Sequence, residues 1–170
     1  MASVFAVLAA IESSAFSRWL RESPSLLAFP LMLSLHAIGM GLAAGINGAL
    51  ALRILGAAPR VPIEELQRFQ PVMWTGFWMN AASGVALLYA YPTKALTNPD
   101  FFLKLAFIAL ALVVVRSLDR RLFGAVSAPR ASLTVPVRRL AVASLVCWSG
   151  AIIAGRLLAY TYTRLFASWR

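Results

Sequence analysis

The sequence has one cysteine and one histidine among its 170 residues, and only six acidic residues against 16 lysines and arginines. Cys147 has no second thiol to form an intrachain disulfide, and a single cysteine cannot build a Cys-based zinc site or an iron–sulfur cluster. Charged residues make up 13% of the chain, against roughly 25% in a soluble domain. The composition therefore lacks what a water-exposed surface needs.

Apolar residues make up 61% of the chain and gather in four long stretches. About 20 consecutive apolar residues suffice for a helix to cross a bilayer. We therefore expect an all-α protein, an integral membrane four-helix bundle that forms a single transmembrane domain over residues 1–170. The predicted spans are about 25–52, 69–91, 101–118 and 140–162.

Residues 2–22 show a different pattern, that of an amphipathic helix. Its apolar residues recur at helical spacing, and polar or charged residues occupy much of the remaining surface. The apolar set is Val4, Leu8, Ile11, Ala15 and Trp19, and the polar set is Glu12, Ser13, Arg18 and Arg21. We interpret this segment as a helix in the membrane interface. A signal peptide is the alternative, because residues 4–10 resemble a short apolar core, but no basic segment precedes them.

The net charge of +10 does not indicate nucleic-acid binding, because the bases lie between and beside apolar spans, where they face lipid headgroups. Nine bases follow spans one and three: Arg53, Arg60, Arg68, Arg116, Arg120, Arg121, Arg130, Arg138 and Arg139. Six lie on the other side: Arg18, Arg21, Lys94, Lys104, Arg164 and Arg170. Since positive residues are retained in the cytoplasm, we expect both termini in the periplasm of a bacterial inner (cytoplasmic) membrane.

His36 lies about ten residues into span one, roughly 15 Å deep at 1.5 Å per residue. An ionisable group at this depth needs a partner and is a functional candidate. No acid within the spans could compensate a protonated ring, so we expect a buried neutral imidazole. It would either contact a cofactor or form hydrogen bonds to a neighbouring helix.

Met32 and Met40 flank His36 at i−4 and i+4, and Asn47 falls near the same helical face. Thioether and imidazole together suit Cu(I), or an axial pair on haem iron. His36, Met32 and Met40 are thus the candidate cofactor-binding residues, with His36 as the candidate metal ligand and haem b or copper as the cofactor. Ordinary packing of methionine explains the same stripe.

The opposite face of this helix is lined by glycine. Gly41, Gly45 and Gly48 follow one another at i, i+4 and i+7, and such a surface lets another helix approach closely, in the same chain or in a partner. Gly84 and Gly155 are the further candidate packing positions, each close to a polar residue of its span.

Asn80 in span two and Arg156 in span four are the remaining polar groups of interest. With alternating helix directions, both fall within roughly two helical turns of His36 in depth. Asn47, Asn80 and Arg156 are therefore our candidates for a polar intramembrane site. The alternatives are an interhelical hydrogen bond for Asn80 and, for Arg156, a side chain that reaches the headgroups.

Four segments resemble a family of small bacterial four-helix integral membrane proteins of unknown function. They read FPLMLSLHAIGMGLAAGINGALALRILG, WTGFWMNAASGVALLYAYP, NPDFFLKL and WSGAIIAGRLLAY. In architecture this family is distantly similar to copper-resistance D domains and cytochrome b561-like bundles. The resemblance covers most of residues 10–163 and implies recurrent positions at His36, Gly39, Gly45, Lys104, Gly155 and Arg156. Such bundles bind haem b through histidines of more than one helix, and bis-histidine ligation within one subunit is excluded here.

The sequence contains no Ser/His/Asp set, Gly-rich phosphate loop or HExxH motif, which argues against a self-contained enzyme. The absence of an acid within the spans argues against a pump that relies on an intramembrane carboxylate. We expect a non-catalytic accessory subunit that assembles or anchors a larger redox or energy-converting complex, for example in electron transport, with other membrane subunits or further copies as partners. The alternatives are a small redox or metal protein that uses His36, and a copper or small-solute permease.

Overall fold

The structure of the protein, a computed structural model, describes residues 2–123 and 134–167. Every regular element in these two ranges is a helix, so the all-α prediction is confirmed. The elements are α1 (Ala2–Glu12), α2 (Ala15–Glu22), α3 (Phe29–Leu55), α4 (Ile63–Gln67), α5 (Gln70–Ala90), α6 (Pro92–Leu96), α7 (Pro99–Phe123) and α8 (Val135–Ala167).

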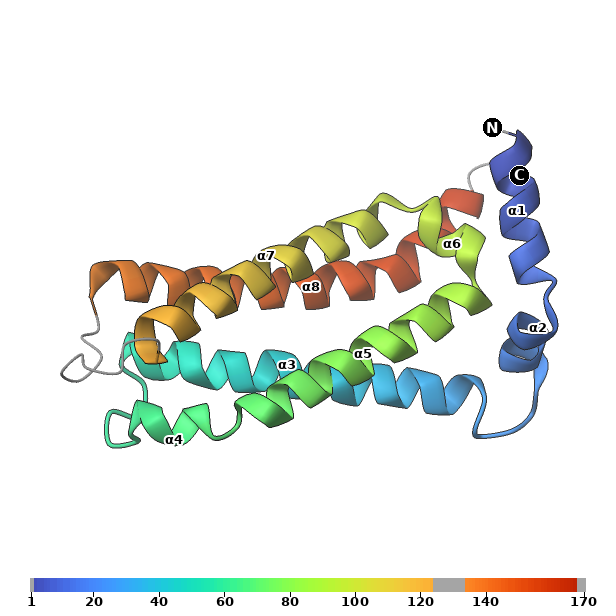
Figure 1. The fold of residues 1–170 in the computed structure, drawn as a ribbon. Coiled ribbons are helices and arrows are strands. Elements are labelled where there is room, and N and C mark those ends of the chain that lie inside the picture. The colour runs from blue at the N-terminus through green and yellow to red at the C-terminus, as the bar shows by residue number, and fades with distance from the viewer. Residues whose placement is uncertain (1, 124–133, 168–170) are drawn as a thin grey trace.

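The four long helices α3, α5, α7 and α8 run along one common direction, and the short helices lie at the two ends (Figure 1). Helix α3 packs against both α5 and α8, and α8 packs against α7. Within the described residues, three segments are long and apolar enough to cross a membrane: Phe29–Leu55, Pro99–Phe123 and Val135–Leu158. Helix α5, our predicted second span, is not one of the three. It carries no charged residue, but Gln70, Asn80 and Ser83 lower its apolar content.

The N-terminal segment differs from the single helix that we expected over residues 2–22. It breaks at Ser13 and Ser14 into α1 and α2, which lie across one end of the long helices (Figure 1). Ser14 has an extended backbone, and its hydroxyl accepts a hydrogen bond from the amide of Ser17, which caps the start of α2. The break also ends the predicted apolar stripe, because Trp19 is exposed while Ser17 and Leu20 are buried.

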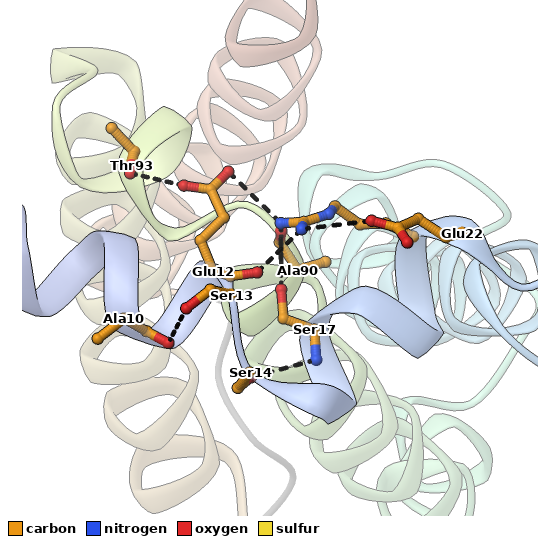
Figure 2. A network of polar contacts seen from close by, with 9 residues as sticks. Ala10, Glu12, Ser13, Ser14, Ser17, Glu22, Ala90 and Thr93 are labelled. Carbon is orange, nitrogen blue, oxygen red and sulfur yellow. Dashed lines mark hydrogen bonds and ion pairs between the residues drawn. The ribbon is translucent and has the colours of Figure 1, made fainter.

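Arg21 fastens α2 to the end of α5 (Figure 2). Its guanidinium donates to the backbone oxygen of Ala90 at 2.9 Å and to that of Glu12 at 2.9 Å, and it forms an ion pair with the Glu12 carboxylate at 3.5 Å. Thr93 donates to the same carboxylate at 2.9 Å. Carbonyls at helix C-termini lack intrahelical hydrogen-bond donors. The Arg21 side chain supplies a donor to one such carbonyl at the end of α1 and to one at the end of α5.

Several helix boundaries also differ from the predicted spans. We expected a loop over residues 53–68, between the first and second predicted spans, and a turn over 92–100, between the second and third. The first of these segments contains α4 and the second contains α6. Helix α3 begins at Phe29 with Pro30 in its first turn, where a missing amide proton costs nothing. It ends at Leu55 and is capped by Gly56, whose φ of 112° is left-handed. Helix α7 continues to Phe123 and α8 starts at Val135, so much of the expected loop 119–139 is helical. Residues 124–133 of that loop lie outside the described residues.

Candidate intramembrane polar site

Two glycines bring α3 and α5 into backbone contact beside the site. A Cβ atom at Gly39 would lie 2.6 Å from both the backbone nitrogen of Asn80 and the backbone oxygen of Gly76. A Cβ at Gly76 would lie 2.5 Å from the Cβ of Leu42. Both distances are too short for any side chain, so the helices approach this closely only because both positions are glycine.

The glycines that we predicted for close packing on α3 do not serve this purpose within the chain. A Cβ at Gly41 or Gly45 would meet nothing within 4 Å, and one at Gly48 would only touch Leu145 at 4.0 Å. Of the two alternatives that we left open for Gly45, the described residues therefore provide no close contact within the chain. The contacts that α3 makes with α5 and α8 leave Gly41 and Gly45 on its exposed side. A contact of this face with a partner stays a prediction.

His36 and Asn80 form a reciprocal pair across the contact of α3 with α5. The ring nitrogen Nδ1 of His36 lies 3.0 Å from the backbone oxygen of Asn80. In return, the side-chain amide of Asn80 donates to the backbone oxygen of His36 at 2.6 Å. The hydroxyl of Ser83 lies 3.3 Å from the same Nδ1 and itself donates to the carbonyl of Met79 at 2.7 Å. Asn80 thus makes the interhelical hydrogen bond that was one of our two interpretations.

The second ring nitrogen of His36 contacts a lysine from a third helix. Nζ of Lys104, on α7, lies 3.0 Å from Nε2 of His36. The Asn80 carbonyl can only accept, so Nδ1 carries a proton and donates. Lysine is the stronger base, so its ammonium donates the hydrogen bond to the bare Nε2. The contacts thus define a neutral imidazole, protonated at Nδ1, beside one positive charge.

Glycines also make room for this lysine and histidine. A Cβ at Gly155 on α8 would lie 3.5 Å from Cδ and 3.7 Å from Nζ of Lys104, so the lysine stem passes directly over this glycine. A Cβ at Gly84 on α5 would lie 3.1 Å from Cε1 of the His36 ring. The site is therefore built from all four long helices, with polar groups on three and a glycine floor on the fourth.

The other residues predicted for a polar site lie elsewhere. Asn47 is buried, but its amide donates to the carbonyl of Ala43 within the same helix at 2.8 Å. Arg156 is exposed, and none of the described residues joins it to His36 by a hydrogen bond. Its place beside His36 is taken by Lys104.

Neither methionine joins His36 in a common ligand set. Met32 packs against the apolar cluster of Leu20, Ala28 and Ala90, whereas Met40 packs against a separate cluster with Ala43 and Trp148. The structure thus places the two thioethers in different parts of the apolar interior, as the packing interpretation expected.

The His36 ring does not fit the haem or copper role either. A metal ligand must offer a free lone pair, but Nδ1 carries its proton toward Asn80, and the lone pair of Nε2 accepts from an ammonium. The positive charge of Lys104, 3.0 Å from this nitrogen, would also repel a metal cation. The donor set therefore disfavours a haem or copper site at His36.

Two members of the site, Lys104 and Ser83, were absent from our candidate site residues. The family resemblance implied a recurrent position at Lys104 but gave it no role, and the depth of the residue is a second signal. His36 lies seven residues after the start of α3 and Lys104 five after the start of α7, about 10 Å and 8 Å at 1.5 Å per residue. Both helices start at the same end of the molecule (Figure 1). Ser83 follows Asn80 by three residues and so shares its helical face.

Comparison of the chain with protein-family models, with curated proteins and with solved structures finds no match.

Proposed function

We propose that the protein is a non-catalytic helical subunit that assembles with other subunits in a membrane. The main support for this proposal is the hydrogen bonding of the His36 ring. The one histidine of the chain has both ring nitrogens engaged in hydrogen bonds to α5 and α7. A general base or metal ligand needs a free lone pair, whereas a group that ties three helices together does not. The redox or energy-converting character of the assembly stays a prediction from the sequence.

The exposed glycine face of α3 supports this proposal as the surface for a partner helix. Gly41 and Gly45 are exposed and have open space where a side chain would stand. Glycines one turn apart let a second helix come close enough for backbone contact. The close approach inside the chain uses Gly39 and Gly76 instead, so internal packing does not account for this second glycine pair.

We further propose the inner (cytoplasmic) membrane of a bacterium as the location, with four crossings and both termini on the periplasmic side. The beginning of α1 and the end of α8 lie at the same end of the long helices (Figure 1), as an even number of crossings requires. The nine-to-six distribution of bases favours the opposite end as the cytoplasmic one.

Gly45→Leu tests the assembly. Because a side chain at Gly45 meets nothing within 4 Å inside the chain, the variant should fold while its leucine blocks a close partner helix. Ala109→Leu is the matched control on the exposed surface of α7. We expect cross-linked or native-gel complexes from membranes to be lost in Gly45→Leu and kept in the control. Complexes of unchanged size and amount in both variants would refute the glycine face as the assembly surface.

A further inference from the structure

We propose that the Lys104 ammonium, held in place by His36, binds the phosphate group of an anionic phospholipid that reaches the site from the bilayer between α5 and α7. The proposal concerns a different surface from the glycine face of α3, so either can fail without the other.

Among the described residues, the charge of Lys104 has no acidic partner. All six acidic residues belong to the described ranges, and the ion pairs seen there use Glu12, Glu22 and Glu65. Asp100 lies one turn before Lys104 on α7, but its carboxylate accepts a hydrogen bond from Thr161 at 2.9 Å and forms no ion pair with Lys104. A positively charged side chain without an anionic partner in the hydrocarbon raises the free energy of the folded protein by several kcal/mol. An anion from outside the chain would therefore stabilise this arrangement.

The ammonium has further N–H groups to donate. It has three of them, and its one hydrogen bond within the described residues is to His36 Nε2. That bond fixes the direction of the side chain, and the Gly155 floor fixes its stem. A phosphate oxygen accepts strongly from lysine. The site thus presents one positively charged ammonium whose N–H groups are already oriented to donate hydrogen bonds.

Access to this donor is lateral. Close packing joins α5 to α3, α3 to α8 and α8 to α7, but α5 and α7 do not form such a pair. Both His36 and Lys104 retain partial exposure. Apolar side chains one helical turn from the site, Met79 and Leu87 on α5 and Phe101 on α7, share its helical faces and are partly exposed as well. A lipid with an anionic headgroup matches this arrangement, because its acyl chains can contact the apolar side chains while its headgroup reaches the Lys104 ammonium.

The depth of the site matches a headgroup. Helix α3 has 27 residues, about 40 Å at 1.5 Å per residue, roughly 10 Å more than the hydrocarbon thickness of a bilayer. If this excess is shared between the two ends, Lys104 at about 8 Å from the start of α7 lies only a few ångströms inside the hydrocarbon boundary. A lysine at that depth meets phosphate with little adjustment of either partner.

The test uses the full chain, purified in a neutral detergent and titrated with palmitoyl-oleoyl phosphatidylglycerol or with the phosphatidylcholine of the same chains, with bound lipid counted by native mass spectrometry. We expect phosphatidylglycerol to bind at least about tenfold more tightly than phosphatidylcholine. Lys104→Met should abolish this preference and Lys104→Arg should keep it. Lys94→Met removes a lysine at the same end of the molecule and is the matched control, with the preference unchanged.

Equal binding of the two lipids by the unaltered protein would overturn the proposal, and this comparison decides it even if Lys104→Met does not fold. A preference lost equally in Lys94→Met and Lys104→Met would assign it to general surface charge, against the proposal. Inorganic phosphate that displaces the lipid at millimolar concentration would identify a free anion as the ligand and overturn the lipid as its source.

Discussion

The ammonium nitrogen of Lys104 lies 3.0 Å from Nε2 of His36 and thereby joins α7 to α3, two helices that do not pack closely along their length. On its other side, the same ring binds the backbone of Asn80 in α5. The imidazole therefore connects three helices through two nitrogens, and each nitrogen has a defined role as donor or acceptor.

The His36–Lys104 hydrogen bond should appear as an energetic coupling. We expect His36→Ala and Lys104→Met, combined, to be less destabilising than the sum of the single changes by about 0.5–3 kcal/mol, as residues in one network are. His36→Ala combined with Lys94→Met should be additive. Unfolding by denaturant in detergent micelles gives the free energies. Additivity of the His36 and Lys104 changes would contradict the contact.

The Gly39 contact should tolerate no side chain. Gly39→Ala places a Cβ 2.6 Å from the Asn80 and Gly76 backbones, and we expect it to lower the free energy of unfolding by about 1–3 kcal/mol, as overpacking does. Gly41→Ala, two residues further along the same helix, enters open space and should be neutral or stabilising by up to about 1 kcal/mol. Equal effects of the two changes on stability in micelles would refute the close approach of α3 and α5.

The Arg21 contacts should hold the N-terminal helices on the end of α5. Arg21→Met removes the donors to the Ala90 and Glu12 carbonyls. We expect it to cost about 1–3 kcal/mol, because the Glu12 carbonyl loses its donor, whereas the Ala90 carbonyl keeps the hydrogen bond of 3.4 Å from the Ser17 hydroxyl. Hydrogen exchange in α1 and α2 should rise while exchange in α3 stays low. Arg18→Met, which changes an exposed arginine of the same helix, is the control. Unchanged exchange in Arg21→Met would show that apolar contacts alone dock these helices.

The topology can be tested by labelling. In a Cys147→Ser background, a cysteine at Arg60 should react with a membrane-impermeant maleimide only after the membrane is opened, because we place this loop in the cytoplasm. A cysteine at Thr97, at the opposite end of the helices, should react in intact cells. Both positions are exposed, so access to reagent is the only variable. The reverse pattern of labelling would invert the proposed orientation.

The sequence predicted the long helices well because their apolar runs are continuous and the boundaries of such runs are set by charge. It predicted α1 and α2 poorly, because the apolar spacing runs on through Ser13 and Ser14, whereas the hydroxyl of Ser14 caps the start of a second helix. It also assigned Pro92 and its neighbours to a simple turn, although proline in a first turn is compatible with a short helix such as α6.

For the site, the sequence identified His36 and Asn80, since polar groups within an apolar run are conspicuous. It missed the pairing of His36 with Lys104 because our counting of bases assigned that lysine to the headgroup side, and one sequence does not reveal which helices are neighbours. For the same reason, the glycine series led us to predict close helix packing at Gly45 and not at Gly39. A glycine pattern shows where helices can approach, whereas the contact with Gly76 depends on the rotation of α3 against α5.

The hydrogen bonds of the His36 ring to Asn80 and Lys104 can be measured directly, because the chain has one histidine. Protein labelled with nitrogen-15 at histidine and lysine, in lipid bilayers, gives a solid-state NMR spectrum in which both imidazole nitrogens belong to His36. We expect a neutral ring with a proton on Nδ1, a bare hydrogen-bonded Nε2, and magnetisation transfer between Nε2 and a lysine Nζ that disappears in Lys104→Met. A proton on Nε2 with a bare Nδ1, or a metal-shifted Nε2 signal, would contradict this expectation.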